Sequence, residues 1–298
     1  MHYLPLNYIE PVFRPPSEAR SLILQVTNGC SYNACTFCDM YTAPQKKFRA
    51  KAAAEIEADI DRVAGLIPGV ERVFLADGDA MALSVRRLEQ TLTAIHQKLP
   101  AVRRVSAYCL PRNVSKKSVE ELTRLRELGL GIVYVGIESG DDTVLAGVRK
   151  GETYQSSLEA LQKLKAAGIK TSVMVLTGLG GTRFWQQHAI NSARLCSAAQ
   201  PDYLSTLVLS LPNGDARLRE GYGGEFKLPD QAGLLAEMAL FLRHLELDRT
   251  VFRSDHASNY LVLKGMLGRD KERLLAQVEA AINDPDGSRL RPEWARGF

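Results

Sequence analysis

Three cysteines lie within nine residues near the start of the chain: Cys30, Cys35 and Cys38. Their spacing, C-x4-C-x2-C, allows one short loop to bring three thiolates to a single metal centre. Soft thiolate ligands suit iron–sulfur clusters and zinc. A closed structural zinc site normally has four ligands, and the other two cysteines, Cys109 and Cys196, are distant in the sequence. The set predicts a metal centre with one open, catalytic position. A structural zinc site completed by a remote His or Cys is the alternative.

The elements that must position this loop are short β-branched runs alternating with longer segments of helical spacing. Strands are predicted over Ser21–Val26, Arg72–Leu75, Arg103–Tyr108, Ile132–Ile137, Thr171–Leu176, Tyr203–Leu209 and Thr250–Ser254. Helices are predicted over Ala52–Leu66, Leu83–Lys98, Ser115–Leu128, Tyr154–Ala167, Arg183–Ala198, Asp230–Leu245 and Arg269–Ile282. Such alternation is typical of βα units that form a parallel sheet.

The predicted fold is α/β, a partial or full TIM-like (β/α) barrel with parallel strands, with an open doubly wound sheet as the alternative. In both architectures the chemistry lies at the carboxyl ends of the strands. Polar or glycine-rich turns follow six predicted strands, and we expect them to converge on one rim. These turns are Asn28–Cys30, Asp77–Asp79, Tyr108–Cys109, Glu138–Gly140, Gly178–Gly181 and Asp255–His256.

Three segments are expected along the chain. Residues 1–20 form a lead-in, 21–228 the barrel core, and 229–298 a final βα unit with a small C-terminal helical appendage. Within the core, the glycine-rich and charged stretch 214–227 predicts a mobile loop or lid.

The composition is that of an ordinary globular protein. Among 298 residues, 45% are hydrophobic and 24% charged, which excludes a wholly disordered or coiled-coil chain. The net charge of +4 does not indicate a nucleic-acid partner. No apolar run approaches the roughly 18 residues of a membrane span, and the first twenty residues lack the apolar region of a secretory signal. A cytoplasmic protein without a membrane partner or a disulfide framework is therefore expected.

A three-cysteine loop directly after the first strand of a βα barrel resembles the radical S-adenosylmethionine (radical SAM) superfamily. The usual spacing there is C-x3-C-x2-C, so this chain has one extra residue between its first two cysteines. Phe37 matches the aromatic residue usual before the third cysteine. The resemblance covers roughly residues 21–209. Within the superfamily it is nearest to stand-alone iron–sulfur oxidoreductases often labelled coproporphyrinogen-oxidase-like.

The resemblance implies a 4Fe–4S cluster on the three cysteines, with SAM bound at the open iron. The turn of Asp77, Gly78 and Asp79 occupies the place of a Gly-Gly-Glu motif that binds the SAM amino group, with Asp79 replacing the glutamate. From the residues alone, Asp77 is equally well explained as a helix cap. Ser106 either approaches the SAM ribose or hydrogen-bonds only within the barrel.

Two further motifs complete the implied SAM site. Glu138 and Ser139, with Lys150, resemble the region that contacts the SAM ribose and carboxylate. The alternatives for Glu138 are a solvated loop end and a salt bridge. Three glycines resemble the glycine motif that, in the superfamily, follows the fifth strand and lies along the adenine of SAM. The alternative is that they form a simple tight turn without a ligand. The three glycines are Gly178, Gly180 and Gly181.

Three residues are hypothetical catalytic groups on the substrate side. Cys109 is a possible hydrogen-atom donor, although cysteine is most often simply buried. Arg253 is suited to a substrate carboxylate or phosphate. His256 is an acid, a base, a substrate ligand or a packed histidine. The basic run of Lys46, Lys47 and Arg49 predicts a solvated loop.

The sequence thus predicts a radical SAM enzyme that abstracts hydrogen from a small organic substrate, with a flavodoxin or ferredoxin as electron donor. Modification of RNA or protein is the alternative within the superfamily, and a zinc or electron-transfer protein the alternative outside it. The last 102 residues contain no cysteine, which disfavours an enzyme with auxiliary clusters.

Overall fold

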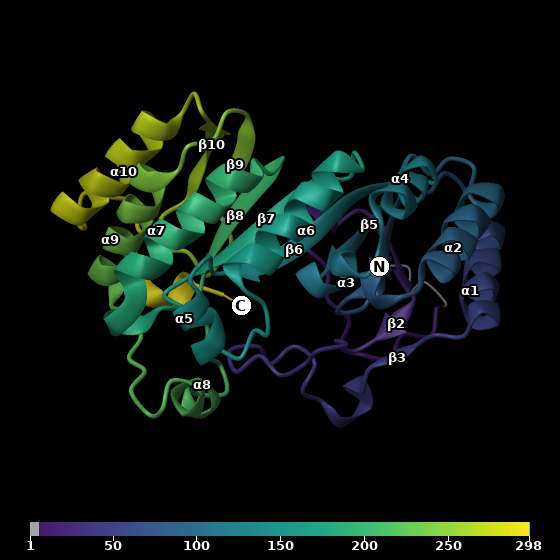
Figure 1. Cartoon of the computed structure of the whole chain (residues 1–298), viewed down its shortest axis with the longest axis horizontal. Helices are drawn as coiled ribbons and strands as arrows, with labels where there is room; N and C mark the ends of the chain where they lie inside the picture. Colours follow the sequence, from purple (N-terminus) through teal and green to yellow (C-terminus); the bar gives the residue numbers. More distant parts are fainter. Residues whose placement is uncertain (1–5, 298) are drawn as a thin grey trace. The chain divides into compact units, whose positions relative to one another are not determined.

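The computed structural model describes residues 6–297 (Figure 1). Eight strands form one sheet in the order β1-β4-β5-β6-β7-β8-β9-β10, and β2 and β3 form a separate antiparallel pair. β9 and β10 pair antiparallel, whereas the other described pairs in the large sheet are parallel. The strands are β1 (Leu22–Gln25), β2 (Thr27–Asn28), β3 (Arg49–Ala50), β4 (Arg72–Ala76), β5 (Arg104–Cys109), β6 (Leu130–Glu138), β7 (Lys170–Thr177), β8 (Tyr203–Val208), β9 (Thr250–Ser254) and β10 (Leu263–Leu267).

Helices separate the parallel strands along the chain. They are α1 (Ala53–Leu66), α2 (Val85–Lys98), α3 (Pro111–Ser115), α4 (Val119–Glu127), α5 (Asp142–Gly147), α6 (Tyr154–Ala166), α7 (Gly181–Ala199), α8 (Ala216–Gly221), α9 (Gln231–His244) and α10 (Lys271–Asn283). Short 3₁₀ turns lie at Pro16–Glu18, Pro44–Lys46, Ala80–Ala82 and Glu293–Ala295. None of the helices in this described part of the chain is long and apolar enough to cross a membrane. The predicted α/β class is confirmed.

Three local predictions differ from the structure. The helix expected over 115–128 begins later, as α4, because Ser118 caps it: the Ser118 Oγ accepts the Glu121 N–H at 3.1 Å. The short helix α3 before it was not predicted and shares only Ser115 with the expected range. β10 was not predicted, since its alternation is interrupted by Gly265. The stretch 214–227, expected as a loop, contains α8.

Contacts between Cα atoms divide the chain into two compact units. The first comprises residues up to 33, 38–135 and 163–171; in it α1 packs against α2, and α2 against α4. The second comprises 34–37, 136–162 and the residues from 172 onward; in it α9 packs against α7 and α10. The predicted segment limits at residues 20 and 228 stay predictions.

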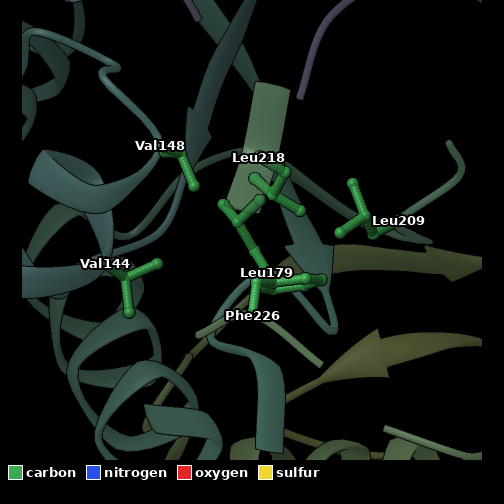
Figure 2. Packing of buried hydrophobic residues seen from close by; sticks show 6 residues of the cluster. All are labelled: Val144, Val148, Leu179, Leu209, Leu218 and Phe226. Atoms are coloured by element: carbon green, nitrogen blue, oxygen red, sulfur yellow. The ribbon is translucent and has the colours of Figure 1, made fainter. Parts of the chain in front are cut away.

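A hydrophobic cluster in the second unit anchors the segment around α8 (Figure 2). Leu218 of α8 and Phe226 after it are buried beside Leu179 of the turn that follows β7. The partly buried Phe37 packs against the same cluster. Its buried members are Val144, Val148, Leu179, Leu209, Leu218 and Phe226. Apolar burial therefore holds this stretch at two points, Leu218 and Phe226, and a helix lies where the sequence predicts only a loop or lid.

Candidate functional site

The start of the cysteine loop rests on the turn that follows β4. Asp77 and Asp79 are fully buried there. The Gly29 N–H donates to Asp77 Oδ2 at 3.3 Å, and the Ser31 N–H donates to Asp79 Oδ1 at 3.1 Å. A Cβ on Gly78 would lie 2.9 Å from the Gly29 carbonyl oxygen and 3.0 Å from the Cys30 Cα, so only glycine allows this approach. The two carboxylates thus fix the backbone on both sides of Cys30.

Asp77 forms a buried ion pair with Lys46. The Lys46 side chain is buried, and its Nζ also donates to the Ile9 carbonyl at 2.8 Å. Lys46 therefore does not belong to a solvated basic run, whereas Lys47 is exposed as expected. Burial, and next the Asp77 charge, raises the pKa of Tyr41. The sequence pattern missed this pair because Lys46 is adjacent to exposed charges.

Asp79 has a second set of partners. Its Oδ2 accepts hydrogen bonds from the Ser31 hydroxyl and from Asn113 Nδ2, the latter at 3.2 Å. Burial raises the pKa of Asp79, and the hydrogen bonds from Ser31 and Asn113 oppose that rise. The Arg112 guanidinium stacks 3.9 Å from the Tyr32 ring centroid. The short helix α3 therefore supports the cysteine loop through two neighbouring side chains that sequence analysis did not select.

The three clustered cysteines are half-buried, and none forms a disulfide. The segment around Cys35 is held by two contacts: the Thr36 N–H donates to the Val148 carbonyl at 3.0 Å, and Arg217 Nη2 donates to the Cys35 carbonyl at 3.0 Å. Over residues 6–297, no three His, Cys, Asp or Glu side chains are grouped closely enough to hold a metal ion. The fit to a 4Fe–4S cluster therefore rests on the donor set, three half-buried cysteines on one loop.

Glu138 ends β6 in a left-handed backbone conformation, with φ of +63°. Its Oε1 lies 3.1 Å from Lys150 Nζ, and both side chains are buried. A Cβ on Gly136 would lie 2.1 Å from that Oε1, so the carboxylate occupies the space a side chain would fill. Glu138 Oε2 is buried without a hydrogen-bond partner. A buried carboxylate oxygen without a partner suits a polar ligand such as SAM.

The turn after β6 continues into a buried polar network. Ser139 Oγ lies 2.8 Å from His188 Nδ1, and the Asp141 N–H donates to Ser139 Oγ at 3.0 Å. Burial lowers the pKa of His188 to about 4. Sequence analysis missed both His188 and Asp141. Asp141 caps α5 by accepting the Val144 N–H at 3.0 Å, a role its position before an apolar helix indicates.

The glycine turn after β7 has a carboxylate beneath it. Gly178 has φ of +90° and Gly181 of +58°, and both conformations favour glycine. The Gly178 N–H donates to Glu237 Oε1 at 2.8 Å, and burial raises the pKa of Glu237 to about 8. The Tyr222 hydroxyl donates to the Leu179 carbonyl at 2.7 Å. A lone glutamate in the apolar run of α9 was the available signal for Glu237.

The remaining predicted residues lie in two separate units. In the first, Ser106 is buried with its hydroxyl 3.3 Å from the Val73 carbonyl, and Cys109 is buried. In the second, His256 is half-buried, and its Nδ1 accepts the Ser258 N–H at 3.1 Å. Burial, and next the Arg291 charge, lowers the pKa of His256. Arg253 is exposed on β9.

Comparison with curated proteins finds partial relatives. A tRNA-2-methylthio-N(6)-dimethylallyladenosine synthase of Dehalococcoides mccartyi is 28% identical over 169 residues, which cover 55% of this chain and 38% of the relative. A putative methylthiotransferase of Methanocaldococcus jannaschii is 24% identical over 241 residues, covering 74% of this chain and 53% of the relative. The chain thus spans about two fifths to one half of these two relatives.

Solved structures share the fold. Coproporphyrinogen III oxidase from Escherichia coli has a TM-score of 0.56 at 18% identity, covering 75% of this chain and 52% of that one. Methylornithine synthase has a TM-score of 0.51 at 17% identity, covering 76% of this chain and 63% of that one. The family model described as the radical SAM superfamily matches residues 24–189, more than half of the chain. This protein therefore belongs to the radical SAM superfamily of enzymes, whose cofactors are a 4Fe–4S cluster and SAM.

Proposed function

We propose that this chain cleaves SAM reductively and uses the resulting 5′-deoxyadenosyl radical to take a hydrogen atom from a small organic substrate. The observation that carries the proposal is the cysteine loop, whose start is hydrogen-bonded to the buried carboxylates of Asp77 and Asp79. When bound, the cluster supplies the electron that breaks the sulfonium bond of SAM. The chain itself binds and orients both cofactors and excludes water.

The proposed cofactor ligands come from the cysteine loop and three turns. Cys30, Cys35 and Cys38 hold the cluster, with Phe37 packed beside them. The turn of Asp77, Gly78 and Asp79 receives the methionine part of SAM. Ribose and carboxylate contacts come from Ser106, Glu138, Ser139 and Lys150, of which Glu138 offers its buried, unpartnered Oε2. The adenine lies along the turn of Gly178, Gly180 and Gly181.

The proposed substrate carries an anionic group, because β9 and β10 place two cations, Arg253 and Lys264, on one face of the sheet. Arg253 pairs in register with Lys264 of β10 and with Ser205 of β8, so the three share a face. The adjacent residue on β10, Gly265, faces the helices, since a Cβ on it would lie 3.0 Å from Leu274 of α10. Arg253 and Lys264 therefore lie on the opposite face of the sheet. Lys264 is paired with Asp255, and among residues 6–297 the Arg253 guanidinium has no hydrogen-bond or ion-pair partner. A carboxylate or phosphate on the substrate supplies one.

Two further groups are proposed on the substrate side. His256 binds a substrate polar group or moves a proton, since its Nδ1 accepts the Ser258 N–H and a neutral ring then carries its proton on Nε2. Cys109 donates a hydrogen atom to a product radical, and one electron from the proposed flavodoxin or ferredoxin, with one proton, returns the resulting thiyl radical to the thiol. We also propose a cytoplasmic location, an oxidoreductase outcome, and a flavodoxin or ferredoxin as electron donor.

Anaerobic reconstitution with iron and sulfide, followed by assay of 5′-deoxyadenosine release from SAM with dithionite, tests the class. We expect release by the wild-type chain and its loss in Cys35→Ala. Cys196→Ala is the matched control, because Cys196 is a buried thiol on α7. Zinc in place of a cluster, or equal release by Cys35→Ala, contradicts the proposal. The anionic group of the substrate is then tested by adding small carboxylic acids, each beside its own amide. Only the acids should increase 5′-deoxyadenosine release by the wild-type chain, and they should not do so in Arg253→Gln.

Modification of RNA is the second candidate, supported by the Dehalococcoides mccartyi relative, whose name gives a tRNA nucleoside as its product. It predicts that unmodified tRNA, and not small carboxylates, stimulates 5′-deoxyadenosine release. The same assay with both additions in parallel separates the two candidates.

A further inference from the structure

Two strand-end turns of the second unit are joined by buried polar side chains. One is the turn of Glu138 and Ser139 after β6, and the other is the glycine turn that begins at Gly178 after β7. Both belong to the same compact unit. His188 of α7 and Glu237 of α9 lie between the turns, and neither side chain reaches solvent. Neither residue belongs to the set proposed above for the cluster, SAM or substrate.

The contacts run continuously from one turn to the other. Ser139 Oγ lies 2.8 Å from His188 Nδ1, and His188 Nε2 lies 3.0 Å from the Leu176 carbonyl. The same Nε2 is 3.5 Å from Glu237 Oε1, which accepts the Gly178 N–H at 2.8 Å. A neutral imidazole satisfies this arrangement: Nε2–H donates to the Leu176 carbonyl, and Nδ1 accepts the Ser139 hydroxyl proton.

The network contains a destabilising feature that packing alone does not explain. Glu237 Oε2 is buried without any hydrogen-bond partner within the described chain. A buried oxygen without a hydrogen-bond partner destabilises the fold, and an apolar side chain at this helix position avoids that loss. What Glu237 supplies in return is an acceptor for the Gly178 N–H, which fixes the peptide at the start of the glycine turn.

We propose that Glu237 and His188 are positioning residues that hold the Gly178 turn and the Ser139 turn in the geometry that binds SAM. The inference rests on the proposed function, because it takes both turns as SAM contacts. Neither side chain touches the cofactor itself in this scheme: Glu237 acts through the Gly178 amide, and His188 acts through Ser139 and the Leu176 carbonyl.

The protonation of the pair supports this assignment. Burial raises the pKa of Glu237 to about 8 and lowers that of His188 to about 4, so both are neutral between these values. The other titratable groups that face them are Asp141, whose charge acts on His188, and Tyr222, whose pKa is raised by burial. Above about pH 8, Glu237 ionises. The cost of burying its charge outweighs the Gly178 hydrogen bond that favours the charged form, so the packed arrangement of the Gly178 turn becomes less stable and SAM binding weakens.

The test measures the dissociation constant of SAM on the reconstituted enzyme by calorimetry, from pH 6 to 9, with urea stability recorded in parallel. Glu237→Gln keeps a carbonyl acceptor for Gly178 but cannot ionise. Glu237→Leu removes the acceptor and the unsatisfied oxygen together. Leu242→Ala is the matched control, because it opens a cavity under the same helix without a polar contact to the turn.

Glu237→Leu should weaken SAM binding about tenfold at pH 7 while losing less stability than Leu242→Ala. Glu237→Gln should bind SAM within about threefold of wild type at pH 7 and retain its affinity at pH 9, where wild type loses it. SAM's own ionisation is common to both proteins and cancels. Wild-type affinity for Glu237→Leu, or parallel pH profiles for wild type and Glu237→Gln, overturns the inference. Failure of wild type to bind SAM overturns the proposed function instead.

Discussion

At the scale of single residues, the position of the Glu138 carboxylate depends on Gly136, which has no side chain. Its Oε1 occupies the volume that a Cβ on Gly136 would need, at 2.1 Å, and Lys150 fixes it there. Gly136→Ala should therefore displace the carboxylate, because the end of a side chain yields more easily than backbone. We expect SAM affinity to fall about tenfold and the free energy of unfolding to fall by about 1–3 kcal/mol, because the buried Glu138–Lys150 contact is disturbed.

Calorimetry and urea unfolding measure the two effects of Gly136→Ala. Gly131→Ala, on the same strand β6, is the control, since its Cβ meets the aliphatic part of Arg104 at 3.0 Å. Unchanged SAM affinity in Gly136→Ala would contradict the proposed role of Glu138.

The buried pair of Lys46 and Asp77 is a second residue-scale feature. Lys46→Met leaves the Asp77 carboxylate buried without its cation, so the free energy of unfolding should fall by about 3–5 kcal/mol. Urea unfolding followed by circular dichroism measures this loss. The double variant Lys46→Met/Asp77→Asn should recover part of it, and the exposed Lys47→Met should be near neutral. Equal loss in the single and double variants would refute an ionic origin.

At the scale of elements, α8 is held to the second unit by apolar burial. Leu218 is fully buried among Leu179 and its neighbours (Figure 2). Leu218→Ala should lower the free energy of unfolding by about 2–5 kcal/mol, because it removes buried methyl groups and leaves a cavity. It should also speed proteolytic cleavage within 214–227. Leu228→Ala, at an exposed position, is the control, and equal cleavage of both variants would show that α8 is not anchored this way.

At the scale of the whole molecule, two buried groups shape the pH dependence of stability. Glu237 has a native pKa of about 8 against 4.5 as its ordinary value, so the native state binds the extra proton between these values and stability falls as pH rises. His188 has a native pKa of about 4 against 6.5, so stability falls as pH drops through that range. The two groups together favour a maximum between pH 4.5 and 6.5.

Glu237→Gln should remove the alkaline part of this dependence. Its stability relative to wild type should rise between pH 5.5 and 8, by up to about 1.4 kcal/mol per pH unit, because only wild type must take up a proton at residue 237 when it folds in this range. Urea unfolding at several pH values measures the difference in the free energy of unfolding between Glu237→Gln and wild type. The other titrating groups are the same in both proteins, so their contributions cancel. A constant difference across that range would contradict an elevated pKa for Glu237.

Sequence by itself determined the α/β class, the seven predicted strands and the cysteine loop. These are local properties: β-branched runs, helical spacing and ligand spacing are properties of neighbouring residues. The motifs at the strand ends also followed, because parallel strands bring their carboxyl ends to one edge.

Only the tertiary structure decided which polar side chains are buried and what they contact. Lys46 and Lys47 are adjacent and identical in type, yet the first pairs with Asp77 and the second is exposed. Glu237 is close to Gly178 although 59 residues separate them, and no local pattern encodes that contact. Burial, and contacts between residues that are distant in the sequence, depend on how helices and strands pack together. The pKa values of His188 and Glu237 are therefore set by the tertiary structure and cannot be read from a local sequence motif.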